Sequence, residues 1–260
     1  MVLHFDLFAD VAGLRHGVST RSGGVSRGAF ASLNVGLHVG DDAPAALENR
    51  RRLCADVGTD AEALVAGEQV LGNAVAWVTE ADRGRGALEA CGALPCIDAL
   101  ITDSPGVPLI AFSADCPLVA LVDPVRRAIG VVHASRRGTF GRVAARSVRA
   151  MERLLGCRAG DLLAAIAPSI GPCCYEVGEE VLADARQALA DPERLFTRRD
   201  GSLYLDLWQA NAAQLAEVGI GQDRIELPSA CTRCHADEFF SYRASGGRTG
   251  RFALVLALEP

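Results

Sequence analysis

The chain has 260 residues, half of them hydrophobic, which is enough to bury the core of one large domain. Its formal net charge of −6, with basic residues scattered along the chain, argues against a nucleic-acid-binding face and favours a small-molecule ligand. The N-terminal apolar stretch contains Asp6 and Asp10, which does not fit a signal peptide. The apolar run 105–122 contains Pro108 and Asp115, so we expect no membrane span, a cytoplasmic protein, and nine cysteines present as reduced thiols.

The first half of the chain predicts a long loop, a surface helix and a hairpin. Residues 16–42 are rich in Gly, Ser and Asn, as in an ordered loop that serves a site. Asp42 is a suitable N-cap for a helix with Pro44 in its first turn, and Gly58 would end that helix. Between 107 and 134, short runs rich in Val, Ile and Leu flank "DPVRR", which predicts a β-hairpin.

The second half predicts three helices and two strands. Apolar residues of 140–155 share one helical face, with Thr139 as N-cap and Gly156 near the end. The stretch "DLLAAIAPSIGPCCYEVGEEV" predicts a strand, a tight turn and a helix that begins near Tyr175. A further helix, "DLWQANAAQLAEVGI", ends at Gly219, and "RFALVLAL" is a terminal strand.

These elements do not follow a regular βαβ rhythm, and no linker divides them. We therefore predict an α+β fold, with mixed or antiparallel sheets flanked by helices, in a single domain over residues 1–260.

A lone cysteine and a lone histidine occupy the two arms of the predicted hairpin. A turn centred between Pro124 and Val125 would place Cys116 directly opposite His133, with Cβ atoms about 4.5–5.5 Å apart. That spacing suits two ligands of one tetrahedral zinc, although both residues could equally pack in the core. Two arginines follow, at 136 and 137, just before a predicted helix start, where they would either hold an anion or face solvent.

Several segments, in order, resemble the multicopper polyphenol oxidase (laccase) domain family, whose members include purine nucleoside phosphorylase/adenosine deaminase enzymes and peptidoglycan editing factors. The markers are "STRSGGVS" (19–26), "SLNVGLHVGDD" (32–42), "NRRRL" (49–53), "DALIT" (98–102), "SADCPLVALVDP" (113–124), "VVHASRRGT" (131–139), "IGPCCYEVGEEV" (170–181) and "FFSYRASGGRTGR" (239–251). The resemblance implies a layered fold of the cytotoxic necrotizing factor-like hydrolase type.

The resemblance also implies a zinc held by one cysteine and two histidines, and this chain departs from that set. Cys116 and His133 match two ligands, but the family's "QVHG" histidine is replaced by Leu71 in "EQVLGNAV". The family's "HAGWRGT" reads "HASRRGT" here, with Ser135 and Arg136 at the changed positions. Either another group completes the site or the metal is lost; the candidates for completing it are Cys173, Cys174, Cys96 and His38.

The activity implied by the resemblance is phosphorolysis of purine nucleosides such as adenosine, inosine and methylthioadenosine, with some adenosine deamination. Purine nucleoside and phosphate are then the partners, zinc is the expected cofactor, and copper is less favoured because the chain lacks His-rich clusters. The candidate catalytic residues are Arg21, Arg137 and Cys174, and the candidate substrate-binding residues are Asn34, Arg136 and Arg243. Without the third histidine, deamination should suffer more than phosphorolysis, because only deamination strictly needs an activated water.

Other functions remain open at this stage. A Cys–His hydrolase would use His133 as base and Cys116 or Cys174 as nucleophile. The "CTRCH" stretch (231–235) matches a c-type haem motif and also offers three zinc ligands, but we favour a reduced turn because no second C-x-x-C completes it. A copper-dependent phenol oxidase, a degenerate member acting as a binding partner, and a homodimer are the remaining hypotheses.

Overall fold

The computed structural model describes residues 2–259 and confirms an α+β fold with mixed sheets. The five-stranded sheet has the order β1-β2-β14-β6-β3, and the six-stranded sheet has the order β13-β9-β7-β8-β5-β4. Their strands are β1 (Val2–Leu3), β2 (Leu14–Ser19), β3 (Val65–Ala66), β4 (Val75–Trp77), β5 (Ala99–Thr102), β6 (Leu109–Ser113), β7 (Leu118–Asp123), β8 (Ala128–His133), β9 (Leu163–Ile166), β13 (Ile225–Glu226) and β14 (Phe252–Leu258).

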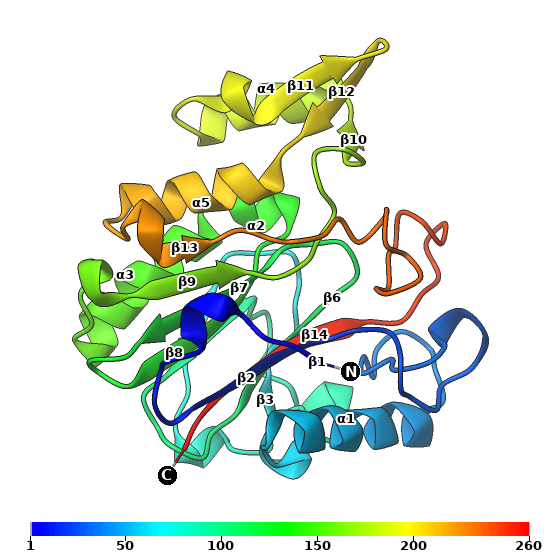
Figure 1. Cartoon of the computed structure of the whole chain (residues 1–260), viewed down its shortest axis with the longest axis vertical. Coiled ribbons are helices and arrows are strands. Elements are labelled where there is room, and N and C mark those ends of the chain that lie inside the picture. The colour runs from blue at the N-terminus through cyan, green and yellow to red at the C-terminus, as the bar shows by residue number, and fades with distance from the viewer. Residues whose placement is uncertain (1, 260) are drawn as a thin grey trace.

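The two large sheets pack face to face and enclose the main core (Figure 1). Alternate residues of β14, such as Phe252 and Leu254, join Leu118 and Ile129 of the other sheet in this core. The intervening residues of these strands are also buried, but against helices on the outer faces. Burial on both faces explains why the strands are continuous apolar runs rather than alternating ones.

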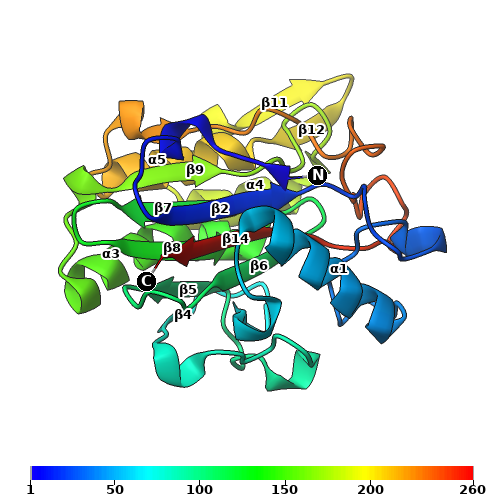
Figure 2. The same cartoon turned by 60° about the horizontal axis from the view of Figure 1, so that its bottom comes forward.

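Helices cover both outer faces, so the molecule has four layers (Figures 1 and 2). Helix α1 (Ala43–Val57) packs on the five-stranded sheet through Leu53 and Val57. Helices α3 (Val143–Leu155) and α5 (Leu207–Glu217) pack on the six-stranded sheet.

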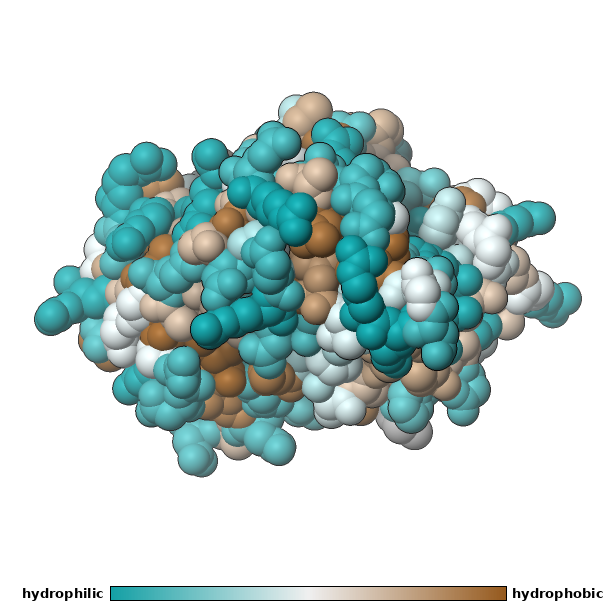
Figure 3. Space-filling model, turned by 90° about the horizontal axis from the view of Figure 1, so that it is seen from above, coloured by the Kyte–Doolittle hydropathy of each residue, from teal (hydrophilic) through white to brown (hydrophobic). Residues whose placement is uncertain are grey.

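A smaller sheet lies at one end of the molecule, beyond α5 (Figure 1). It has the order β10-β12-β11 and carries helix α4. Its elements are β10 (Glu176–Val177), α4 (Glu179–Ala188), β11 (Phe196–Arg199) and β12 (Ser202–Leu205). Seen from this end, the surface is largely hydrophilic, with smaller hydrophobic areas between the polar side chains (Figure 3).

The predicted hairpin exists as β7–β8, but its predicted register is wrong. His133 pairs with Leu118, and Cys116 precedes the strand by two residues. The turn is longer than expected because the Asp123 carboxylate accepts the backbone N–H groups of Val125 and Arg126. Since the slip is two residues, the side-chain faces of the pair are unchanged.

The helix predicted over 140–155 is confirmed as α3, which begins three residues later, and a separate short helix precedes it. A short helix, α2 (Arg136–Phe140), begins after Ser135, whose side chain accepts the Gly138 N–H. The chain then turns at Arg142, which has a left-handed backbone, before α3. Thr139 is therefore not an N-cap, and the two arginines at 136 and 137 lie inside the first helix rather than before it.

The helix expected near Tyr175 begins later, at Glu179, because the chain first forms the short strand β10. Other predicted ends are confirmed: Asp42 caps α1, Gly58 ends it in a left-handed conformation, and the terminal strand is β14. Within residues 2–259, no helix combines the length and the apolar content needed to cross a membrane.

The loop between β2 and α1 is anchored by two buried polar residues of α1. The Asn49 amide donates to the backbone of Ser32 and Asn34 and accepts the N–H of Val25. The Arg50 guanidinium, 3% exposed as a residue, donates to the carbonyls of Val35, Gly86 and Ala87 over 2.6–2.8 Å. The ordered loop therefore depends on side-chain to backbone hydrogen bonds.

We predict that Arg50→Lys lowers the free energy of unfolding by about 2 kcal/mol or more, because an ammonium cannot reach all three carbonyls and leaves buried acceptors unpaired. Chemical denaturation followed by circular dichroism measures the change. The neighbouring Arg51 is exposed and gives a matched control, Arg51→Lys, that should change stability little. Equal stability of the two variants would show that the Arg50 hydrogen bonds do not matter.

Candidate active site

Cys116 and His133 meet at the end of the β7–β8 hairpin, despite the changed register. His133 is 4% exposed, its imidazole Nδ1 is hydrogen-bonded to Asp98, and Cys116 lies near enough to act on its pKa. Burial alone would lower the pKa of His133, but these two partners raise it to about 9. The hairpin therefore presents a thiol and an oriented imidazole side by side.

Asp98 connects His133 to the segment that contains Leu71. Its Oδ1 lies 2.8 Å from His133 Nδ1 and accepts the Leu71 N–H at 3.1 Å. Its Oδ2 accepts the N–H groups of Val70 and Gly72 at 3.2 and 2.7 Å. Burial favours the neutral carboxylic acid, but the hydrogen bonds with His133 and the backbone outweigh it and hold the pKa of Asp98 below its usual range.

Leu71 occupies a backbone conformation that is uncommon for leucine. Its φ is 62°, in the left-handed region that histidine adopts more readily than most non-glycine residues. Its side chain is exposed at 43%. The turn therefore presents an exposed apolar side chain, which cannot bind a metal.

No third ligand joins Cys116 and His133 within residues 2–259. In this described part of the chain, the only set of three or more His, Cys, Asp or Glu ligand atoms close enough to share one ion is formed by Cys173, Cys174, Cys231 and Cys234. Cys116 and His133 belong to no such set, and Cys96 lies exposed on a loop where its N–H donates to Glu68.

Cationic side chains gather beside the Cys116–His133 pair, around Tyr175. The guanidinium of Arg243 lies 5.3 Å from the centre of the Tyr175 ring. Burial and the nearby Cys116 raise the pKa of Tyr175, whereas Arg136 and Arg243 act in the opposite direction. Cys116, Arg136 and Arg243 therefore all lie near enough to the Tyr175 phenol to act on its pKa.

Arg251 and Asp115 complete this surrounding group, and neither was a sequence candidate. Burial lowers the pKa of Arg251, and the nearby Cys116 and Asp115 oppose the change. The Asp115 carboxylate accepts the Thr232 hydroxyl and the Arg243 N–H, each at 2.7 Å. Asp115 directly precedes Cys116 in the chain. Nothing in the sequence indicates that Thr232 and Arg243 contact it in the fold.

The other sequence candidates lie in different surroundings. The Arg21 guanidinium donates to the carbonyls of Ala31 and Ala236, so it fastens two loops. Asn34 is fully buried, and its amide oxygen accepts the N–H groups of Gly36 and Arg251. Arg137 is exposed on α2.

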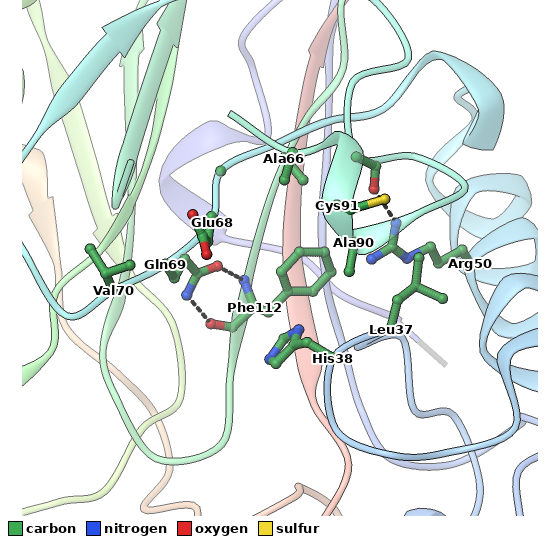
Figure 4. A pocket seen from close by; sticks show the side chains of 13 residues that line it. Leu37, His38, Arg50, Ala66, Glu68, Gln69, Val70, Ala90, Cys91 and Phe112 are labelled. Atoms are coloured by element: carbon green, nitrogen blue, oxygen red, sulfur yellow. Dashed lines mark hydrogen bonds between the residues drawn. The ribbon is translucent and has the colours of Figure 1, made fainter. Parts of the chain in front are cut away.

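A cavity of about 400 Å³ is lined in part by residues 66–70, which directly precede Leu71 in the chain (Figure 4). His38 and Phe112 line it, with their rings in edge contact, and Gln69 is held there by two hydrogen bonds to the Phe112 backbone. Burial lowers the pKa of His38 to about 4, and His133 is among the positive groups that add to this effect. The imidazole of His38 is therefore neutral at physiological pH and lies within electrostatic reach of His133.

Comparisons with known proteins agree over nearly the whole chain. Residues 15–259 match the family model described as multi-copper polyphenol oxidoreductase laccase. Purine nucleoside phosphorylase YlmD of Geobacillus stearothermophilus is 40% identical over 242 residues, which span 92% of this chain and 88% of that protein. Adenosine deaminase RL5, from an unknown prokaryotic organism, is 34% identical over 248 residues, spanning 95% and 94%. The crystal structure of Bacillus licheniformis hypothetical protein YfiH aligns with a TM-score of 0.92 at 35% identity, covering 96% of this chain and 94% of that one.

We predict that Asp98→Asn lowers the free energy of unfolding by about 3 kcal/mol, because an amide has one acceptor oxygen for the four N–H groups that converge there. Thermal and chemical denaturation measure the loss. Asp103 is exposed, so Asp103→Asn removes a charge without this network and should be nearly silent. If both variants lost equal stability, net charge rather than the buried hydrogen bonds would be responsible.

Proposed function

Because the chain belongs to the multi-copper polyphenol oxidoreductase laccase family, we propose that it cleaves purine nucleosides with phosphate and deaminates adenosine only weakly. The printed names of its relatives, purine nucleoside phosphorylase and adenosine deaminase, support the substrate class. The arrangement of residues around Cys116 supports the preference between the two reactions.

The observation that carries the proposal is the set of arginines beside the Cys116–His133 pair. The Arg243 guanidinium lies 5.3 Å from the centre of the Tyr175 ring, Arg136 also acts to lower the pKa of Tyr175, and Cys116 opposes the lowering of the Arg251 pKa by burial. Guanidinium groups bind phosphate through paired N–H donors, so this group suits an inorganic phosphate. Phosphorolysis demands mainly that phosphate be aligned below the ribose and that developing charge be stabilised, and both are matters of positioning.

The cavity of Figure 4 suits the nucleoside. The Phe112 ring, which is 5% exposed and has the Arg50 guanidinium 4.8 Å from its centre, contributes apolar lining to the cavity. The neutral His38 offers one donor and one acceptor. In this proposal the base lies in the cavity and the ribose extends toward His133 and the arginines. The N-glycosidic bond would then lie next to the bound phosphate.

The residues present do not fit the zinc that the family resemblance implies. A catalytic zinc normally has three protein ligands and a water, whereas Cys116 and His133 supply two and Leu71 supplies none. Deamination of adenosine needs an activated water, which this pair alone does not provide. Weak deamination beside retained phosphorolysis follows from this difference.

One observation favours a second candidate function. Cys116, His133 and Asp98 form a thiol–imidazole–carboxylate series, in which the imidazole contacts the thiol and Asp98 orients its Nδ1. The same order of groups activates the nucleophile in thiol hydrolases. Rapid alkylation of Cys116 by iodoacetamide at neutral pH, lost in His133→Ala, would support the hydrolase, and a protected Cys116 would contradict it.

We predict that the purified protein releases purine base from adenosine or inosine only when phosphate is present, and releases ammonia from adenosine much more slowly. Chromatography of the products measures both reactions in one sample. Ammonia release as fast as base release would refute the proposed preference.

We predict that Leu71→His restores deamination. Histidine supplies the third ligand and accepts the left-handed backbone at this position. Deamination should rise by at least about tenfold, which corresponds to about 1.4 kcal/mol in the barrier. Leu71→Asn is the matched control, because asparagine also tolerates the backbone but has no imidazole. Equal activity of both variants would show that the missing ligand is not what limits deamination.

We predict that Arg243→Gln raises the KM for phosphate and leaves the KM for nucleoside nearly unchanged, because it removes a cation from the proposed phosphate site. Steady-state kinetics with each substrate varied in turn measures the two constants. Arg158→Gln, an exposed arginine after α3, controls for net charge. A larger change in the KM for nucleoside would place the phosphate elsewhere.

A further inference from the structure

Four cysteines from two distant parts of the chain gather outside the Cys116–His133 site. Cys173 and Cys174 lie between β9 and β10, and Cys231 and Cys234 lie after β13. All four sulfur atoms are within 4.8 Å of one another. Cys234 Sγ is 3.7 Å from Cys173 Sγ and 3.4 Å from Cys174 Sγ. All four are free thiols.

The fold holds the two loops in this register independently of the thiols. Strand β13 runs parallel to β9, and this pairing extends to a bridge between Ser169 and Cys231. The loops approach closely because Gly171 lacks a side chain: a Cβ there would meet the Trp208 ring at 3.0 Å and the Cys231 Cβ at 3.2 Å. The Trp208 indole N–H also donates to the Ser169 hydroxyl at 2.7 Å.

We propose that these four cysteines bind one structural zinc ion. Tetrahedral zinc with Zn–S bonds of about 2.3 Å places its sulfur ligands about 3.8 Å apart, which agrees with the two short separations given above. Thiolate ligands select zinc over magnesium or calcium. Each thiol that binds the ion loses its proton to solvent.

The surroundings of the cluster suit a negatively charged zinc–thiolate centre. The Gly171 N–H donates to Cys231 Sγ at 3.2 Å, a contact typical of the hydrogen bonds that stabilise metal-bound thiolates. The Arg199 guanidinium donates to the carbonyls of Pro172 and Cys173, which brings a positive charge to the same loop. Cys231 is buried while Cys173 and Cys234 are exposed, so an ion can enter from solvent.

Such a zinc would act on the candidate active site through both loops. Tyr175 directly follows Cys174, and Arg243 lies on the segment after Cys234. Thr232, between the two cysteines of the second pair, bonds to Asp115 at the start of the Cys116 segment. Four sulfur ligands leave no open position for substrate, so the role is to fix the loops that carry these residues.

The test measures zinc and thiols in the untagged full-length protein, purified with a reductant and without chelator. Elemental analysis should find about one zinc per chain, and titration with a mercurial reagent should release it as about four thiols react. The Cys231→Ser/Cys234→Ser double variant should lose the zinc. Cys91→Ser/Cys96→Ser, which removes two exposed cysteines elsewhere, and Cys116→Ala should both keep it.

A cobalt-substituted wild-type protein gives a readout that does not depend on a variant folding. Four thiolates around cobalt produce an intense charge-transfer band, which should appear with one equivalent of the ion. Metal-free protein, a Cys174–Cys234 disulfide under the reducing conditions, or iron in place of zinc would each overturn the proposal. So would a zinc that is lost in Cys116→Ala but kept in the Cys231→Ser/Cys234→Ser variant. None of these outcomes depends on nucleoside cleavage, so the proposed function is tested separately.

Discussion

The carboxylate of Asp98 is the constraint on which the candidate site depends. It is buried, and it binds the imidazole of His133, at the end of β8, and three consecutive backbone N–H groups of residues 70–72. A buried carboxylate is stable only when such donors surround it, so the turn at Leu71 and the imidazole of His133 must stay where they are. The geometry of the site is therefore maintained by hydrogen bonds within the protein and does not need a metal to assemble it.

The shape of the turn at residues 70–72 rests on these backbone hydrogen bonds and not on the side chain at position 71. The left-handed backbone at Leu71 persists because the N–H groups on either side of it, as well as its own, bind Asp98. Leucine there costs some backbone strain and exposes an apolar side chain, but it removes no group on which the fold relies. The side chain at this position can thus vary without loss of the turn.

Local signals in the sequence predicted the elements whose ends are determined by nearby residues. Asp42, Gly58 and the apolar run 252–258 each act within a few positions, and α1 and β14 agree with them. The hairpin register was missed because the Asp123 side chain lengthens the turn, and the break between α2 and α3 was missed because Arg142 adopts a left-handed backbone without being glycine. Of the candidate site, the pairing of Cys116 with His133 was visible, but the contacts of Arg251 and Asp115 depend on segments more than a hundred residues apart.

The cysteine cluster shows why a metal site built from two distant cysteine pairs is hard to predict from the sequence of either pair alone. In the sequence, "CTRCH" lacks a second C-x-x-C, and "PCCY" offers adjacent cysteines that rarely suggest a shared ion. Only the parallel pairing of β9 with β13, a crossover that no local pattern encodes, brings the two pairs together. The protein therefore holds two sets of soft ligands with opposite properties: four thiols that can enclose an ion completely, and a thiol–imidazole pair that cannot. A measured zinc content alone does not tell which of these sets binds the ion. The set is identified by whether the zinc is lost on substitution of Cys116 or of Cys231, and zinc at the four thiols would hold the loops that carry Tyr175 and Arg243.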